Sequence, residues 1–147
     1  MEKTFELKAL KIGMFGVECK YRLSETDDEN IVTENEYHVK VSRPIHPDME
    51  ALFSGELSEI ASRILGVEKA EPTGIAFAGK NDNIGISIIG RIPSAFGDVT
   101  FKTPRIKYLI SESDVAALLT VFADKIVDET HAYLFEGKTA ELEVFGE

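Results

Sequence analysis

The sequence predicts an α+β protein in which two amphipathic helices cover one face of an antiparallel sheet. Three observations support this fold class: short segments that alternate apolar and polar residues, two longer segments with helical apolar spacing, and a proline or a capping sequence ahead of each helix. The chain has 147 residues, 44% of them hydrophobic and 29% charged, which is typical of one folded domain. We expect residues 1–137 to form a single domain and residues 138–147 to form a short tail or a last strand.

Three strands are predicted in the first part of the chain. Residues 4–12 and 17–23 alternate apolar and polar side chains on either side of the turn-forming residues 13–16, which indicates a hairpin. The acidic residues 24–30 have the composition of a solvated loop, and a third strand is expected over residues 31–41.

A helix is expected from Pro47 to Gly66. Pro47 suits the first turn of a helix, and Asp48 and Glu50 lie where negative charge is favoured by the helix dipole. Gly66 is a natural terminator. Between these ends, the apolar residues keep helical spacing: Leu52, Phe53, Leu57, Ile60, Ala61, Ile64 and Leu65.

The second half is predicted to repeat this order. Residues 73–79 and 84–92 are short apolar runs with glycines, separated by a polar turn, and indicate a second hairpin. Residues 99–101 and 105–110 would supply one or two further strands, with Pro104 marking an edge, a bulge or a turn between them.

A second helix is predicted to begin at the capping-box pattern Ser111-Glu-Ser-Asp114 and to end at Gly137. One face of it carries the apolar residues Val115, Leu118, Leu119, Phe122, Ile126 and Tyr133. The whole chain then reads as βββα followed by βββα, which suggests a pseudo-duplicated unit whose two helices share one face of a curved sheet.

Composition limits the classes of protein to which the chain can belong. Its formal net charge is −10, from 26 acidic and 16 basic residues, which disfavours non-specific attraction to polyphosphate. No apolar run approaches the roughly 20 residues of a membrane-spanning helix, and the N-terminus lacks the pattern of a secretory signal. Cys19 is the only cysteine, so no intramolecular disulfide can form, and we expect it to fill space in the core. A cytoplasmic protein without membrane contact is expected.

One segment has the spacing of a phosphate-binding loop. Gly74, Gly79 and Lys80 follow the Gly-x4-Gly-Lys pattern, but Asn81 stands where a hydroxyl side chain would hold magnesium. The following segment is predicted to be a strand, whereas a phosphate site needs the N-terminus of a helix. We therefore interpret both glycines as turn residues.

The histidines match no catalytic or metal-binding pattern. His38, His46 and His131 are separated by intervals that fit no zinc site. His46 begins a His-Pro-Asp tripeptide, which J-domain co-chaperones also carry, but its flanks are not basic and a strand precedes it, so a turn into a capped helix is the preferred interpretation. His38 and Cys19 could form a nucleophilic pair if distant strands meet, although no neighbouring residue would activate them. We expect no metal, no cofactor and no enzymatic activity.

A basic cluster around Pro104 is the candidate binding site. Lys102, Arg105, Lys107 and Tyr108 combine cations with an aromatic ring, as single-stranded nucleic acid binding requires. Further cations on predicted strands could extend the surface: Lys20, Arg22, Lys40 and Arg43. The alternative is that strand alternation simply places aromatic residues in the core and cations in water.

The second half of the chain resembles a group of small uncharacterised proteins encoded by phages and prophages. The resemblance rests on Gly-Ile-Ala-Phe-Ala-Gly-Lys from Gly74, on Ile-Ser-Ile-Ile-Gly at 86–90, on Thr103-Pro104, and on the final helix running into Tyr133-Leu-Phe-Glu-Gly-Lys138. It implies no catalytic residues. It implies a context of phage DNA replication or recombination. Separately, the acidic C-terminal residues 141–147, with Phe145 near the end, resemble the tails by which single-stranded DNA-binding proteins recruit partner proteins, and a docked final strand is the alternative.

Two functional hypotheses follow. The first is a non-enzymatic accessory protein of phage DNA metabolism, whose partner is single-stranded nucleic acid or a replication or recombination protein. The second is an acidic interaction module that self-associates as a homo-oligomer or inhibits a basic host protein by presenting a DNA-like negative surface.

Overall fold

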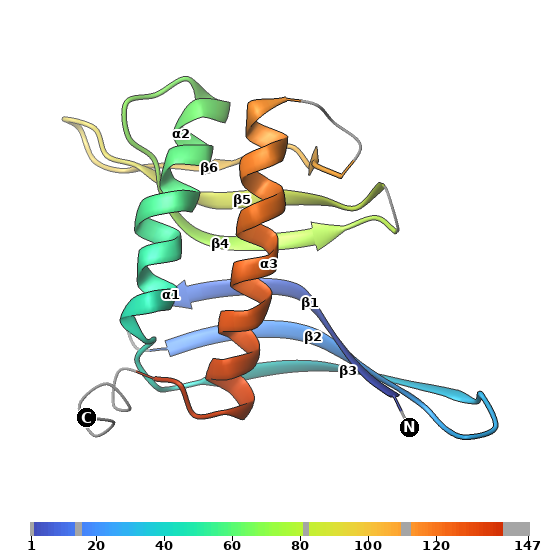
Figure 1. Cartoon of the computed structure of the whole chain (residues 1–147). Coiled ribbons are helices and arrows are strands. Elements are labelled where there is room, and N and C mark those ends of the chain that lie inside the picture. The colour runs from blue at the N-terminus through green and yellow to red at the C-terminus, as the bar shows by residue number, and fades with distance from the viewer. Residues whose placement is uncertain (1, 14–15, 81–82, 110–112, 140–147) are drawn as a thin grey trace.

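The computed structural model describes residues 2–13, 16–80, 83–109 and 113–139, which form one antiparallel sheet with helices on one side (Figure 1). The strands are β1 (Glu2–Gly13), β2 (Gly16–Thr26), β3 (Val32–Val41), β4 (Glu71–Ala78), β5 (Gly85–Ile92), β6 (Val99–Lys102) and β7 (Ile106–Lys107). Their order across the sheet is β3-β2-β1-β4-β5-β6, and β7 also pairs with β5. The helical segments are α1 (Pro47–Ala51), η1 (Leu52–Leu57), α2 (Ser58–Leu65) and α3 (Asp114–Phe135).

The two halves of the chain have the same topology. In each half, three consecutive strands form an antiparallel meander and a helical segment follows, and the first strands of the halves, β1 and β4, meet at the centre of the sheet. Both helical layers lie across the same face and run in opposite directions (Figure 1). The predicted fold class is confirmed, although the second half has a further short strand, β7, between β6 and α3.

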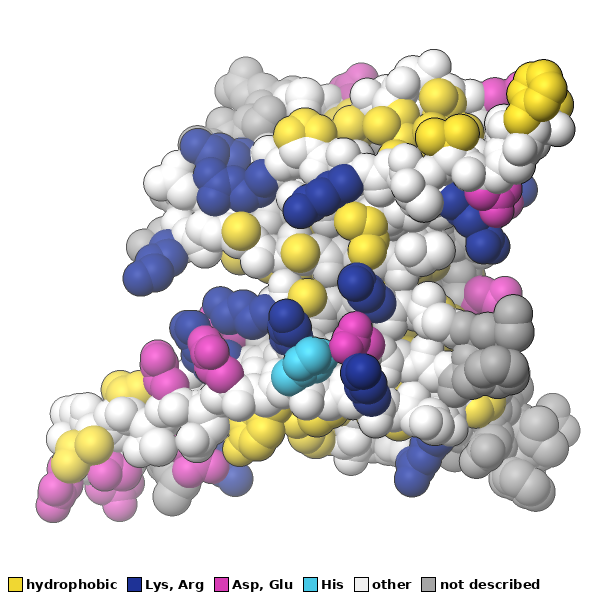
Figure 2. All heavy atoms as spheres, turned by 180° about the vertical axis from the view of Figure 1, so that it is seen from behind, with side chains coloured by type: hydrophobic (Ala, Val, Ile, Leu, Met, Phe, Trp, Pro, Cys, Tyr) yellow, Lys and Arg dark blue, Asp and Glu magenta, His cyan; other side chains and the backbone are white. Residues whose placement is uncertain are grey.

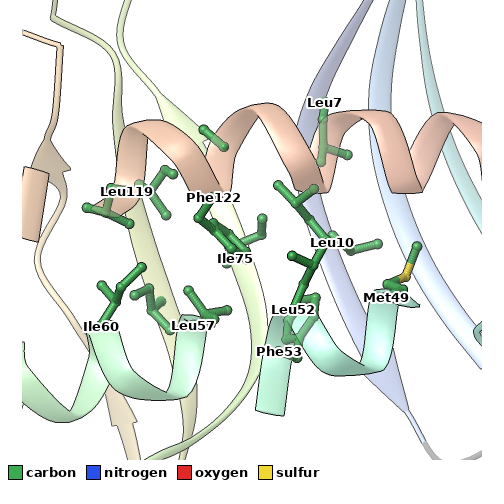
Figure 3. Packing of buried hydrophobic residues seen from close by; sticks show 14 of the residues in the cluster. Leu7, Leu10, Met49, Leu52, Phe53, Leu57, Ile60, Ile75, Leu119 and Phe122 are labelled. Carbon is green, nitrogen blue, oxygen red and sulfur yellow. The ribbon is translucent and has the colours of Figure 1, made fainter. Parts of the chain in front are cut away.

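The register of the central strands determines which side chains face the helices. Leu10 of β1 is paired with Cys19 of β2 and with Ile75 of β4, and all three are buried. Because successive strand residues point to opposite faces, their neighbours along each strand point away from the helices. Figure 3 shows Leu10 and Ile75 packed against side chains of η1 and α3. Cys19 therefore fills space in the core, as predicted.

The first helical layer is one continuous run from Pro47 to Leu65. His46 caps it, since its Nδ1 accepts a hydrogen bond of 3.0 Å from the Asp48 N–H, which confirms the turn into a capped helix. The middle segment η1 is π-helical, and its i→i+5 bonds place Leu52 and Leu57 on the same buried side. The run ends at Gly66, whose φ of 68° is left-handed.

The second helix, α3, begins two residues later than its predicted cap. Ser113 is the N-cap, and its hydroxyl accepts a hydrogen bond of 3.1 Å from the Ala116 N–H, so the assignment of the cap to Ser111 was wrong. Serines stand at both positions, and the capping-box spacing favoured the earlier one. The far end is held to the first half by Tyr133, whose hydroxyl donates to the Arg43 carbonyl at 2.6 Å.

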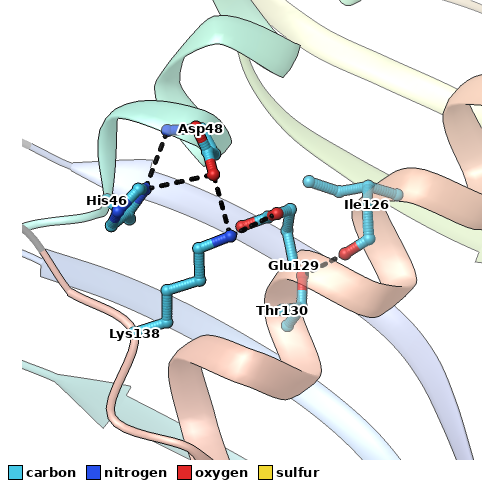
Figure 4. Close-up of polar contacts among 6 residues, drawn as sticks. All are labelled: His46, Asp48, Ile126, Glu129, Thr130 and Lys138. Atoms are coloured by element: carbon cyan, nitrogen blue, oxygen red, sulfur yellow. Dashed lines mark hydrogen bonds and ion pairs between the residues drawn. The ribbon is translucent and has the colours of Figure 1, made fainter.

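Residues just after α3 are also anchored to the first half. Lys138 Nζ lies 2.9 Å from an oxygen of Asp48 and 2.8 Å from an oxygen of Glu129 (Figure 4). Thr139 forms an isolated bridge with Ile45. The beginning of the predicted tail or last strand therefore packs on the domain, and residues 140–147 lie outside the described part of the chain.

Two segments differ from their predicted form. Residues 24–26 extend β2, and the turn that follows is closed by Asp27, whose Oδ1 accepts hydrogen bonds of 2.9 Å from the N–H groups of Glu29 and Ile31. The strand predicted over residues 105–110 contains only Ile106 and Lys107 within the described residues. Pro104 interrupts pairing there, and the Thr103 hydroxyl instead accepts a bond of 2.9 Å from the Ile88 N–H. Among the described helices, none has the length and apolarity to cross a membrane.

Candidate nucleic-acid interface

The face of the sheet opposite the helices, called the open face below, is not covered by any described helix (Figures 1 and 2). Figure 2 shows lysine and arginine side chains gathered over it. Strand register and local contacts place half of the chain's 16 basic residues on this face: Lys8, Lys11, Lys20, Arg22, Lys40, Lys102, Arg105 and Lys107. The same register also points Glu6, Glu18, Glu34 and Glu36 to this face, so these eight cations outnumber those carboxylates there, although the whole chain is acidic.

Some cations of β1 and β2 are partly neutralised. Arg22 hydrogen-bonds to Glu36 at 2.7 Å and lies 3.9 Å from Glu6, and Lys8 lies 2.9 Å from the same Glu6 oxygen. The hydrogen bond from Arg22, and then its charge, lowers the pKa of the Glu36 carboxyl, so Glu36 is ionised at neutral pH. These groups form a mixed-charge network at the end of the sheet nearest the β2–β3 turn.

A second network surrounds Glu18. His38 Nε2 lies 2.8 Å and Lys40 Nζ 3.8 Å from the same Glu18 oxygen. The hydrogen bond with His38 lowers the pKa of Glu18, and the charge of Lys40 acts in the same direction. Lys11 lies opposite Glu18 across β1 and β2, and its charge also lowers the pKa of Glu18, whereas Lys20 forms no ion pair with a carboxylate of the described residues.

The other half of the open face carries Lys102, Arg105 and Lys107, as the sequence predicts. Lys102 pairs with Ile89 and Lys107 with Gly85, and both of these β5 positions point away from the helices. Lys107 Nζ reaches the Asn83 side-chain oxygen at 3.4 Å. Within the described chain, none of the three cations forms an ion pair with a carboxylate, so their charge is available to an anionic ligand.

Small residues separate the two groups of cations. At the centre of the sheet, the side chains that point to the open face belong to Ala9, Gly74, Ala76, Ala78, Gly85 and Ser87. A Cβ on Gly74 would lie 2.8 Å from the Leu10 carbonyl oxygen, so β1 and β4 approach closely because Gly74 has no side chain. The side chains of Lys11 and Ile89 lie over Gly74, and that of Arg105 lies over Gly85, so the exposed small side chains between the two groups of cations include Ala76 and Ala78.

Tyr108 does not belong to this surface, and the prediction that its ring is presented for stacking is wrong. Tyr108 is only 7% exposed, and burial, together with the nearby charge of Asp124, raises the pKa of its hydroxyl. Side chains alternate between the two faces along an extended segment, and Tyr108 is two residues from Ile106. Tyr108 therefore points to the same side as Ile106, which packs on the core. Here the alternative interpretation, aromatic residues inward and cations outward, describes the structure.

A cleft of about 630 Å³ opens where β1 and β4 diverge. The two strands pair only over residues 9–11 and 74–76, and beyond this point their ends separate. The cleft is lined by side chains from both halves and from α3, including Lys8, Arg22, Lys80, Tyr108 and Asp124. Arg22 Nε is buried and has no hydrogen-bond partner among the described residues, so this wall offers an unused donor. Figure 2 shows the open face hollowed on one side.

The remaining sequence candidates have structural roles. Gly79 follows β4 with a left-handed φ of 99°, so its interpretation as a turn residue is confirmed, whereas Gly74 lies within β4 and its interpretation as a turn residue was wrong. Cys19 faces the core and His38 the open face, so they do not form a nucleophilic pair. Arg43, proposed to extend the basic surface, lies beyond the end of β3. No group of side chains in residues 2–13, 16–80, 83–109 and 113–139 has the arrangement of a metal site.

No protein-family model, curated protein sequence or solved structure matches this chain. The fold and the open face therefore define its class in structural terms: an α+β protein with a pseudo-duplicated βββα topology, one covered sheet face and one exposed cationic face.

Proposed function

We propose that this protein binds single-stranded nucleic acid through the open face, as a non-enzymatic accessory protein of phage DNA metabolism. The observation that carries the proposal is the placement of half of the lysines and arginines on one sheet face of a chain whose net charge is −10. Four of these cations form no ion pair with a carboxylate of the described residues: Lys20, Lys102, Arg105 and Lys107. A polyanion would supply the missing counter-charge.

The arrangement favours recognition of phosphates over recognition of bases. The small side chains of Ala76, Ala78 and Ser87 lie between Lys11 and Lys20 on one side and Lys102 and Arg105 on the other, so a ligand backbone lying across them would reach both groups of cations. Among the described side chains that point to the open face from β1, β4 and β5, none is aromatic. We therefore expect weak sequence preference and strong salt dependence, because each phosphate contact releases counterions.

Fluorescence anisotropy with a labelled oligothymidine tests this proposal at low salt. Replacing Lys102, Arg105 and Lys107 together with Gln should weaken binding at least tenfold and reduce the slope of log K against log[salt] by about 0.7 per lost phosphate contact. The matched control replaces Arg63, Lys69 and Lys125, which belong to the helical layer or the loop after it, with Gln. Equal losses in both triple variants, or no binding at tens of micromolar protein, would refute the proposal.

A second candidate, the acidic interaction module, is favoured by the β2–β3 turn. Glu25, Asp27, Asp28 and Glu29 are gathered on this hairpin, which projects from the sheet in Figure 1. A basic protein would dock on these carboxylates. A pull-down from host lysate with the natural chain and with a Glu25→Gln, Asp28→Asn, Glu29→Gln variant should retain a basic partner only with the former.

A further inference from the structure

Strand β3 is the outermost strand on its side of the sheet. Its inner side pairs with β2 over ten consecutive residues without a register shift, and its sequence contains no proline. Its outer side pairs with no described strand. A long and regular edge of this kind is a template for pairing with another strand.

The hairpin geometry identifies the residues whose backbone groups point outward. The Asp27 N–H donates to the Ile31 carbonyl, so these two residues are a hydrogen-bonded pair. Bonded and non-bonded pairs alternate along an antiparallel ladder, and the β2–β3 register is continuous from this turn to Val41. The backbone groups of every second β3 residue therefore point away from β2: Val32, Glu34, Glu36, His38 and Lys40.

If two copies of β3 lie side by side in opposite directions, the charged side chains of these outward residues face residues of opposite charge. If two copies of β3 pair antiparallel about a two-fold axis at Tyr37, residue 34 of one copy faces residue 40 of the other, and residue 36 faces residue 38. Glu34 then opposes Lys40, and Glu36 opposes His38, with each contact made twice. All four residues lie on the open face, where opposite charges on directly opposed strand residues are favourable.

On the helix side of the sheet, the same pairing places the two Tyr37 rings at the axis. Tyr37 is 41% exposed, and its ring stacks on Tyr21 at a centroid distance of 5.1 Å with an interplanar angle of 18°. The pair at the axis is a non-bonded one, in which opposed side chains are closest. On the open face, Val32, which is 56% exposed, comes opposite Ser42 of the second copy.

We infer that β3 is the self-association surface of this protein and that its occupant is β3 of a second copy of the same chain, related by a two-fold axis at Tyr37. The two sheets join into one continuous sheet, with the open faces on the same side. Lys20 and Lys40 of both copies then lie on one surface, which doubles the length of the cationic face. The interface is isologous, so it closes as a dimer.

Sedimentation velocity over a range of protein concentrations measures how tightly the chain dimerises, and charge-reversal variants of Glu34 and Lys40 test the inferred pairing. Glu34→Lys places two cations opposite each other, and Lys40→Glu places two carboxylates opposite each other, so each variant alone should dimerise at least about tenfold more weakly than the natural chain. A mixture of the two variants should dimerise at least as well as the natural chain, because both opposed pairs are then complementary. The double variant Glu34→Lys, Lys40→Glu should recover dimerisation in the same way.

Two further variants separate this pairing from other modes. His38→Pro removes an outward N–H without removing a backbone hydrogen bond to β2, although it also removes the side-chain contact with Glu18, and it should abolish the dimer while circular dichroism shows a folded chain. Val99→Lys, on the opposite edge strand β6, should leave the dimer intact. A natural chain that stays monomeric at several hundred micromolar would overturn the inference, as would mixing that fails to restore the dimer or a dimer that is lost on Val99→Lys.

Discussion

Arg105 occupies the space above Gly85: a Cβ added to Gly85 would lie 2.6 Å from Arg105 Cγ. The Gly85 position points to the open face, because its neighbour Ile86 is fully buried on the other side. The guanidinium continues across β5 to the end of β4, where it lies 3.1 Å from a Cβ added to Gly79. Two glycines therefore hold a cation close against the sheet, in the position from which it would meet a ligand.

We expect Gly85→Val to lower affinity for single-stranded oligonucleotides by displacing Arg105. The β7 backbone would also move, because a Cβ would lie 2.8 Å from the Ile106 carbonyl oxygen, and a loss of about 1 kcal/mol in the free energy of unfolding is expected. Anisotropy titrations of Gly85→Val, Arg105→Ala and the double variant measure the coupling. Losses of affinity that simply add would contradict it, because the two changes remove the same contact. Gly55→Ala is the matched control, since nothing lies within 4 Å of its Cβ position.

Phe122→Ala should cause one of the largest losses of stability for a single substitution. Phe122 is fully buried between the two helical layers, and its ring meets Phe53 edge-on at a centroid distance of 6.4 Å (Figure 3). Removing the ring leaves a cavity, and the free energy of unfolding should fall by about 3–5 kcal/mol in urea titrations. Val121→Ala, at an exposed neighbouring position, should change it by less than about 0.5 kcal/mol.

The contact between Lys138 and Asp48 should make stability depend on pH in the acid range. The hydrogen bond from Lys138 lowers the pKa of the Asp48 carboxyl, so the contact stabilises the fold above the carboxyl's unfolded pKa of about 3.9. The stabilisation is lost as the pH falls through the lower folded value. We expect Lys138→Met to lower the urea midpoint at pH 6 and to have little effect at pH 2.5.

The stabilisation by Lys138 should also be lost at high pH. Hydrogen bonds to Glu129 and then to Asp48 raise the pKa of Lys138, so its contribution is present below the unfolded pKa of about 10.4 and is lost as the pH rises through the higher folded value. An equal effect of Lys138→Met on the urea midpoint at pH 2.5, 6 and 12 would show that the side chain acts through packing alone.

Cys19 should be unreactive in the folded protein. Its thiol is fully buried between the sheet and the helices, and burial raises its pKa to about 12, so almost no thiolate exists at pH 8. A chromogenic disulfide reagent should label it slowly under native conditions and rapidly in urea. Rapid stoichiometric labelling in native buffer would contradict the placement of Cys19 in the core.

The elements of the fold were predictable because each depends on neighbouring residues. Period-two alternation marks β1 and β2, and helical apolar spacing marks α3 from Asp114 to Phe135. The errors lie where two local signals compete. Ser111 and Ser113 both suit a cap, and the capping-box pattern pointed to the wrong one. The turn after β2 begins later than predicted because Asp27 closes it with its side chain.

The candidate site was predictable only in part. Lys102, Arg105 and Lys107 lie on the open face, and the same alternation contained a signal that Tyr108 is buried, since it follows Ile106 at the strand period. In the first half, the sequence also named Lys20, Arg22 and Lys40 correctly, but it named Arg43, which lies beyond β3, and missed Lys11. Lys11 and Lys20 face the same surface as Lys102 only because β1 and β4 are adjacent.

The sequence by itself determined the order of the elements, the side of each strand that is apolar and the acidic character of the chain, because these are properties of composition and of residues a few positions apart. Only the tertiary structure decided that β1 and β4 meet at the centre, that cations of both halves share one face and that β3 lies at an edge. The physical reason is that a strand's alternation specifies which of its sides is buried but not its neighbour, whereas strand order is set by the packing of both helical layers on one common sheet.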